Sequence, residues 1–338
     1  MPTPSWRARA GRPAGGVGVV LALCAALGVG VGLARPEPAG ALGLPVVGGT
    51  LGLPVVGGTL GGVEDLVGVV DPAVRAQLPA DRRLWGPYES RPTPEKCTEG
   101  SPACVDTTIK DMTKRFESLG CDHDALFSLL YLRVTERYKV VAATPGYFTD
   151  VATVNREDAI FYDLYAKTFG EWHAYRPERV PPIWRLAYAT ADARQATGSG
   201  DLLLGMAAHI LRDLPFTLWR VANVTRDDHL QVNPMLKSVY SQVVAEAAAR
   251  FDPTITLADT VPGSDTLVTE VIAQWRDKAW RDGTALLAAP DATAWQAVAD
   301  RIEREAWATG LTIYLGTRYP VRDLTVTRDA YCASHRAG

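Results

Sequence analysis

The sequence predicts an all-α protein, a multi-helix bundle around one buried central helix. Three observations lead to this fold class. Apolar residues recur at helical spacing over long stretches. No long stretch alternates apolar and polar residues in a way that demands a sheet. Residues 202–219 are apolar on nearly every side, which is typical of a central helix. The 338 residues, 47% of them apolar, are enough to bury a sizeable core.

The individual helices follow from this spacing and from the residues that interrupt it. Proline cannot continue a helix, so Pro215 should kink or stop the central one. Residues 311–315 fit either a short strand or a last helical turn. The expected helical segments, in chain order, begin at residue 105, after the start signal at 122–124, at about 148 and after Pro181-Pro182, and continue with 202–219, 227–251, 265–288 and 291–309.

The sequence predicts three segments before the helical domain at 105–338. Residues 1–41 have a basic start, an apolar stretch and the small residues Ala39-Gly40-Ala41, the pattern of a cleaved secretory signal. The alternative is a retained membrane anchor, because the apolar stretch is just long enough to span a bilayer. Residues 42–62, which contain a perfect nine-residue tandem repeat rich in glycine and proline, are expected to be a linker, and 63–104 an irregular segment.

Cysteine usage agrees with export. Four cysteines follow the signal, and an even number in an oxidising compartment suggests two disulfides, for which three pairings are possible. A turn-rich stretch separates Cys97 from Cys104, so we expect these two to pair, and Cys121 to pair with Cys332. Four free thiols remain the alternative if the protein is not exported.

Charge limits the possible partners. The full chain carries a net charge of −3, and loss of residues 1–41 would remove four arginines and one glutamate and leave it more acidic. Nucleic-acid binding needs a basic face, so it is not expected. No stable membrane span is expected after signal cleavage, and a small-molecule ligand cannot be specified from the sequence.

The central helix carries two polar residues that need an explanation. His209 and Asp213 are four residues apart and share one helix face. Burying them costs free energy unless they are paired, so they are either a self-satisfied structural pair, a catalytic acid/base pair or half of a divalent-metal site. Asp158 and Asp228 are the candidates for completing a metal site, and Arg276 is a candidate catalytic residue or a salt-bridge partner of Asp213.

The residues around His209 resemble a bacterial family known as domain of unknown function 5995. The stretch from Gly205 to Pro215, Gly-Met-Ala-Ala-His-Ile-Leu-Arg-Asp-Leu-Pro, is similar to the family motif Gly-Met-Asn-Ala-His-Ile-Asn-x-Asp-Leu-Pro, and the likeness extends over most of 125–315. Ala207 and Leu211 replace two amides of that motif. The resemblance implies an all-α fold and a candidate site at His209, but no particular reaction.

Three functions remain open from the sequence. One is an exported, metal-assisted hydrolase, in which a divalent ion bound by His209 and Asp213 activates a water molecule. Another is an exported binding or scaffold protein in which His209, Asp213, Arg276 and Asn233 form a structural polar network. A third is a protein that binds a lipid or another apolar ligand between its helices.

Overall fold

The computed structural model describes residues 97–255, 264–319 and 323–336, so the predicted signal, the repeat linker and the irregular segment up to residue 96 lie outside it. Every regular element in these ranges is a helix, which confirms the predicted all-α bundle. The elements are α4 (Pro102–Leu119), α5 (Ala125–Ala142), α6 (Val151–His173), η2 (Pro177–Arg179), α7 (Pro182–Asp192), α8 (Gly198–Ala207), η3 (Ala208–Asp213), α9 (Leu214–Val221), α10 (Arg226–Arg250), α11 (Ser264–Ala288), α12 (Ala292–Thr317) and α13 (Asp323–His335).

The helix ends follow local chemistry. Pro102 begins α4, three residues before the expected start, because a proline is tolerated in the first turn of a helix. The Asp150 side chain accepts a hydrogen bond from the backbone N–H of Thr153 and so caps α6, and Thr225 caps α10 in the same way. Residues 311–315 lie inside α12, so the alternative of a short strand is wrong.

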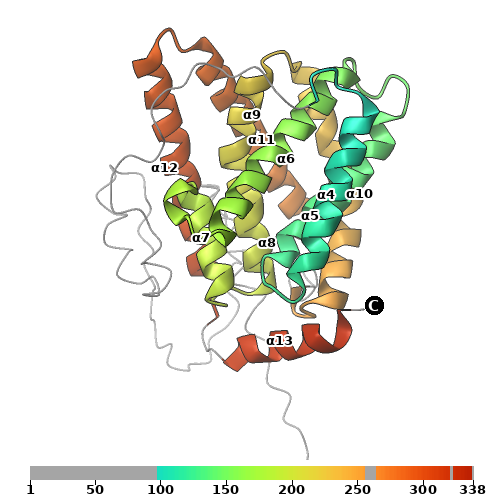
Figure 1. The fold of residues 1–338 in the computed structure, drawn as a ribbon, viewed down its shortest axis with the longest axis vertical. Helices are drawn as coiled ribbons and strands as arrows, with labels where there is room; N and C mark the ends of the chain where they lie inside the picture. The colour runs from blue at the N-terminus through green and yellow to red at the C-terminus, as the bar shows by residue number, and fades with distance from the viewer. Residues whose placement is uncertain (1–96, 256–263, 320–322, 337–338) are drawn as a thin grey trace, which may run out of the picture.

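The central helix is made of α8, η3 and α9, which follow one another without a break (Figure 1). Helices α5 and α12 pack on α8, and α6 and α11 pack on α9. Around this axis lies an aromatic core whose largest fully buried members are Trp184, Tyr165 and Tyr188. The predicted central position of residues 202–219 is therefore confirmed.

The last helix, α13, was not predicted and lies across one end of the bundle (Figure 1). A disulfide joins Cys332 in α13 to Cys121, just before α5, and a second joins Cys97 to Cys104, so both expected pairings are present. A buried Arg328 Nη1 also donates a 2.6 Å hydrogen bond to Asp201 in α8. These contacts fix α13 to α8 and to the turn that precedes α5. Among the helices of the described ranges, none is long and apolar enough to cross a membrane.

Candidate functional site

The candidate site lies on a π-helical turn in the middle of the central helix. In this turn, η3, the backbone N–H of Leu214 donates to the carbonyl of His209, five residues earlier rather than four. Pro215, in the first turn of α9, has no N–H, and its ring would crowd a carbonyl of the preceding turn in a regular α-helix. The wider turn relieves this conflict, so the chain continues where a kink or a stop was expected. Single π-helical turns inside helices are frequent at functional sites.

His209 and Asp213 are paired on this turn, as their spacing predicted. His209 Nδ1 lies 3.2 Å from Asp213 Oδ2, and both side chains are buried. The same carboxylate oxygen accepts a 2.9 Å hydrogen bond from Trp184 Nε1, and Oδ1 accepts a 2.7 Å bond from Arg212 Nη1. Arg212 Nε in turn donates to Glu303 Oε1 at 2.9 Å. A carboxylate held by these donors can only accept at His209, so we place the histidine proton on Nδ1.

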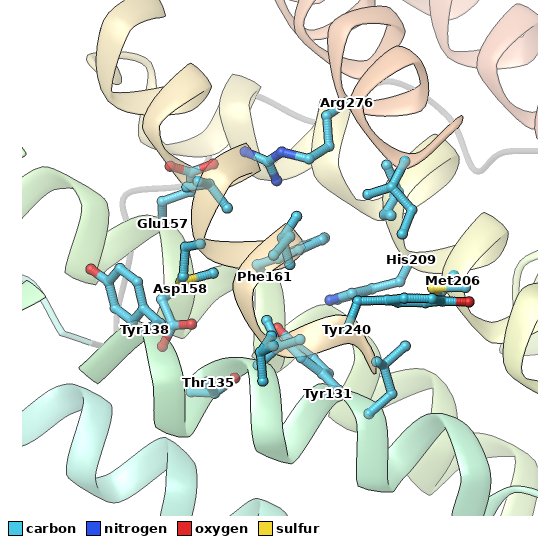
Figure 2. A pocket seen from close by; sticks show the side chains of 18 of the residues that line it. Tyr131, Thr135, Tyr138, Glu157, Asp158, Phe161, Met206, His209, Tyr240 and Arg276 are labelled. Atoms are coloured by element: carbon cyan, nitrogen blue, oxygen red, sulfur yellow. The ribbon is translucent and has the colours of Figure 1, made fainter. Parts of the chain in front are cut away.

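The other ring nitrogen of His209 is left with its lone pair. Burial lowers the pKa of His209, an effect that Asp213 opposes and Arg276 reinforces, so the ring is neutral at pH 7. Phe161 stacks on the imidazole at a centroid distance of 3.5 Å, and Tyr131 contacts it at 4.3 Å. His209 Nε2 is buried and has no hydrogen-bond partner among the described residues. Figure 2 shows this nitrogen pointing into a pocket.

The pocket is an apolar cavity of about 110 Å³ between α5, α6, α10 and α11, with the central helix as its floor. Most of its lining is aromatic or aliphatic, as is usual for a small-molecule site. The lining residues are Phe127, Leu130, Tyr131, Val134, Thr135, Tyr138, Val154, Glu157, Asp158, Phe161, Met206, His209, Ile210, Val232, Met235, Leu236, Val239, Tyr240, Ile272 and Arg276. A site of this kind was one of the three functions left open by the sequence.

Several polar atoms of this lining are buried without a protein partner. Besides His209 Nε2, they are Tyr131 Oη, Thr135 Oγ1, Glu157 Oε2 and Asp158 Oδ2, none of which has a hydrogen-bond partner within the described part of the chain. Burial raises the pKa of Glu157 to about 7, against the opposing charge of Arg276, and burial together with Glu157 raises that of Asp158 to about 7. Buried polar groups are normally satisfied, so the gathering of five such atoms around one cavity makes it the candidate ligand site.

Arg276 lines the same cavity but does not pair with Asp213. Its Nε donates to Asn233 Oδ1 at 2.9 Å, and its Nη2 donates to the carbonyl oxygen of His229, also at 2.9 Å. Burial lowers the pKa of Arg276 to about 10. The single polar network expected from the sequence is therefore two networks. One joins His209, Asp213, Arg212 and Glu303 to Trp184, and the other joins Arg276 to Asn233 and His229.

The metal site expected at His209, Asp213, Asp158 and Asp228 is not assembled. Both carboxylate oxygens of Asp228 accept backbone N–H groups at the start of α6, from Thr149 at 2.6 Å and from Asp150 at 3.1 Å. Asp228 therefore holds the backbone that leads into α6, while Asp158 does line the cavity. The described ranges contain no group of three or more His, Cys, Asp or Glu side chains arranged to hold a metal ion.

Sequence reasoning missed other members of the site. Glu157 was not considered, although it falls with Val154 and Phe161 on one face of α6, where a carboxylate interrupts an apolar stripe. Tyr131 and Thr135 are four residues apart on α5 and could have been found in the same way. Glu303 lies in α12, 91 residues beyond its partner Arg212, and no local pattern marks it.

Fold and site together define an all-helical protein with an apolar pocket at a buried His-Asp pair. The chain belongs to the family of unknown function DUF5995, whose family model matches residues 105–315. This confirms the resemblance seen in the sequence, and the match includes every residue that lines the pocket. Comparison with curated proteins and with solved structures gave no match.

Proposed function

We propose that this protein binds a small, largely apolar molecule in the cavity, and that His209 Nε2 accepts a hydrogen bond from it. The observation that carries the proposal is this nitrogen, which is buried, directed into an apolar cavity and unpartnered among the described residues. A site with mostly apolar walls and a few convergent polar groups is the usual form of a small-molecule pocket.

A purely structural role for His209 accounts for less of the geometry. Such a role explains the bond from Nδ1 to Asp213, which holds the ring in place. It does not explain why the opposite nitrogen faces a cavity where Tyr131 and Thr135 also present unpartnered hydroxyl groups, as judged over the described residues. Leaving polar groups buried and unpaired is costly, and a ligand that pairs with them removes that cost.

Proton transfer is a second candidate function, and the His209-Asp213 pair is the observation that favours it. A carboxylate that accepts from Nδ1 fixes the tautomer and leaves Nε2 as a base, the arrangement used in general-base catalysis. A metal-assisted hydrolase, the sequence-based hypothesis, would need a further ligand beside His209 and Asp213. Asp228 is occupied at the start of α6, so the proposal does not rest on metal chemistry.

Calorimetric titration with benzyl alcohol, a one-ring molecule with a single hydroxyl group, tests the binding proposal. We expect saturable binding to the protein and at least tenfold weaker binding to His209→Phe, which removes the acceptor and fills part of the cavity. Absence of binding to the wild-type protein, or equal affinity in the folded variant, would contradict the proposal.

A pair of threonine variants provides the matched control. Thr135 and Thr190 are both buried, and each has a hydroxyl without a partner among the described residues, but only Thr135 lines the cavity. Thr135→Val should change the affinity for benzyl alcohol at least threefold, whereas Thr190→Val should leave it unchanged. Equal effects of the two substitutions would count against binding in this cavity.

We also propose that the chain is exported. The two disulfides support this proposal, because such bonds persist in oxidising compartments. The sequence pattern of residues 1–41 supports it independently. If export is correct, the mass of the protein recovered outside the producing cell should correspond to a chain that begins at residue 42.

A further inference from the structure

We propose that the ligand is an organic ammonium ion, whose charged end lies beside Asp158 and whose apolar body fills the cavity. This inference rests on the proposed function, since both require the cavity to be a ligand site. Three independent features of the lining point to this chemical class: the hydrogen-bonding character of its unpartnered atoms, its balance of charge and its aromatic rings.

The unpartnered atoms of the cavity favour a ligand that donates hydrogen bonds. His209 Nε2 is an acceptor because the ring proton is on Nδ1. Glu157 Oε2 and Asp158 Oδ2 are carboxyl oxygens, which only accept once the carboxyl group has lost its proton, and the hydroxyl groups of Tyr131 and Thr135 can accept as well as donate. A primary ammonium group offers three donors and no acceptor, so it complements this set. A carboxylate ligand offers only acceptors and would face repulsion as well.

Among the described residues, the balance of charge in the cavity leaves Asp158 without a cation beside it. Arg276 lies on the side of Glu157 in Figure 2, and its charge counteracts the effect of burial on that residue. For Asp158, in contrast, burial and the neighbouring Glu157 both raise the pKa. The other ionisable groups that line the cavity with Asp158 are Tyr131 and Tyr138 on α5, Glu157 on α6, His209 on η3, Tyr240 on α10 and Arg276 on α11. An ammonium ion would supply the missing positive charge.

The aromatic rings of the cavity suit a cation with an apolar body. Tyr131, Tyr138, Phe161 and Tyr240 all line it, and cations are attracted to the faces of such rings. The cavity volume of about 110 Å³ sets the size of the apolar part. A cavity of roughly 150 Å³ holds benzene. The cavity is somewhat smaller than this, so a single ring is the largest apolar body expected, and it needs a slight outward movement of the walls.

Four compounds of nearly equal shape test the inference by calorimetric titration of the disulfide-bonded full chain at pH 7. They are benzylamine, benzyl alcohol, benzoate and toluene. Benzylamine should bind at least tenfold more tightly than benzyl alcohol, and benzoate should bind more weakly than toluene. If benzyl alcohol binds as tightly as benzylamine, the ammonium inference fails and the proposed function stands. If none of the four compounds binds, both fail.

Substitution of Asp158 tests whether its carboxyl group causes the preference for benzylamine over benzyl alcohol. Asp158→Asn should reduce the ratio of benzylamine to benzyl alcohol affinity to less than threefold while benzyl alcohol still binds. Asp163→Asn is the matched control, because Asp163 is also partly buried on α6 but does not line the cavity. It should keep the tenfold preference. A full preference in Asp158→Asn would overturn the proposal.

Proton release by the wild-type protein gives a test that does not depend on a folded variant. At pH 6 the carboxyl groups of Glu157 and Asp158 carry protons that an incoming ammonium ion would displace. Titrations in two buffers of different ionisation enthalpy should therefore show proton release with benzylamine and none with benzyl alcohol. Equal proton release for the two compounds would contradict an ammonium ion bound beside Asp158.

Discussion

At the scale of single residues, the site has a fixed part, the Asp213 carboxylate with the His209 nitrogen bonded to it, and a free part, the other nitrogen of the ring. Asp213 is held from both sides, by Trp184 and by Arg212, and it holds His209 in turn. Only the far nitrogen of the imidazole is available to a ligand. Because the fixed part lies in the core and the free part in the cavity, a ligand can meet His209 without disturbing the pairing behind it.

Glu157 makes the stability of the protein depend on pH in a direction that can be stated. Burial raises its pKa from 4.5 to about 7. Between these values the folded protein keeps a proton that the unfolded chain has released, so the free energy of unfolding falls as the pH rises through this window. The contribution is complete below about pH 4.5 and lost above about pH 7.

The variant Glu157→Gln cannot release this proton. Relative to the wild type, it should gain on the order of 2 kcal/mol in free energy of unfolding between pH 4.5 and pH 8, less than the full shift implies because Asp158 shares the same environment. Urea denaturation of both proteins across this range measures the difference. A difference that does not change with pH would show that Glu157 titrates as an exposed carboxyl.

At the scale of helices, packing distances are set by a few small residues. Gly205 in α8 faces Phe127 in α5, and a Cβ atom at Gly205 would lie 2.4 Å from a ring carbon of Phe127. The two helices can approach this closely only because the side chain is absent. Phe127 also contacts the His209 ring, at a centroid distance of 5.6 Å, so this crossing helps to position the site.

Two glycine substitutions separate packing from helix propensity. Gly205→Ala should reduce the free energy of unfolding by about 2 kcal/mol, because overpacking forces Phe127 to move. Gly170→Ala in α6 is the matched control, since a Cβ there meets no atom within 4 Å. It should be neutral or stabilise by up to about 1 kcal/mol through better helix propensity. Thermal or urea denaturation measures both, and equal effects would contradict the packing argument.

The helices were predictable where their chemistry is local. Apolar spacing, proline and capping residues indicated the central helix and most of its neighbours. The π-helical turn was not predicted, because a proline indicates a conflict but not how the backbone resolves it. The helix α13 was also missed. Its burial depends on Arg328 meeting Asp201 and on Cys332 meeting Cys121, contacts between residues far apart in sequence.

The site was predictable only where the contacts that form it are local in the sequence. The four-residue spacing of His209 and Asp213 fixes their pairing within one helix. The cavity depends on how five helices are placed around that pair, which no single stretch of sequence records. Asp228 illustrates the difference. Its position near a helix start was visible in the sequence, but its acceptance of two amides from the start of α6 arises only in the folded chain.

At the scale of the whole molecule, one disulfide constrains most of the fold. The Cys121–Cys332 bond joins positions 211 residues apart, whereas Cys97–Cys104 joins positions only 7 apart. In the chain-entropy description, a cross-link stabilises by restricting the unfolded chain, and the effect grows with loop length. The long loop contains nearly all of the bundle, including the whole pocket.

Paired serine substitutions measure the two contributions. Replacing Cys121 and Cys332 together should lower the free energy of unfolding by about 5 kcal/mol, and replacing Cys97 and Cys104 together by about 2 kcal/mol, as the loop lengths imply. Urea denaturation of the two double variants and the wild type gives both values. A larger loss for the short loop would show that direct contacts, rather than chain entropy, dominate.

The bonds from Asp228 to the segment before α6 have a mechanical consequence for the pocket. Asp228 belongs to the first turn of α10, and its two acceptors tie that turn to the residues that lead into α6. Tyr147 Oη adds a 3.1 Å bond to the carbonyl of Gln231 at the same place. Helices α6 and α10 both line the cavity, so two of its walls are tied together at one end. Because these bonds hold the two helices together at their starts, we expect any separation of α6 from α10 to be smallest near Asp228 and larger toward their other ends.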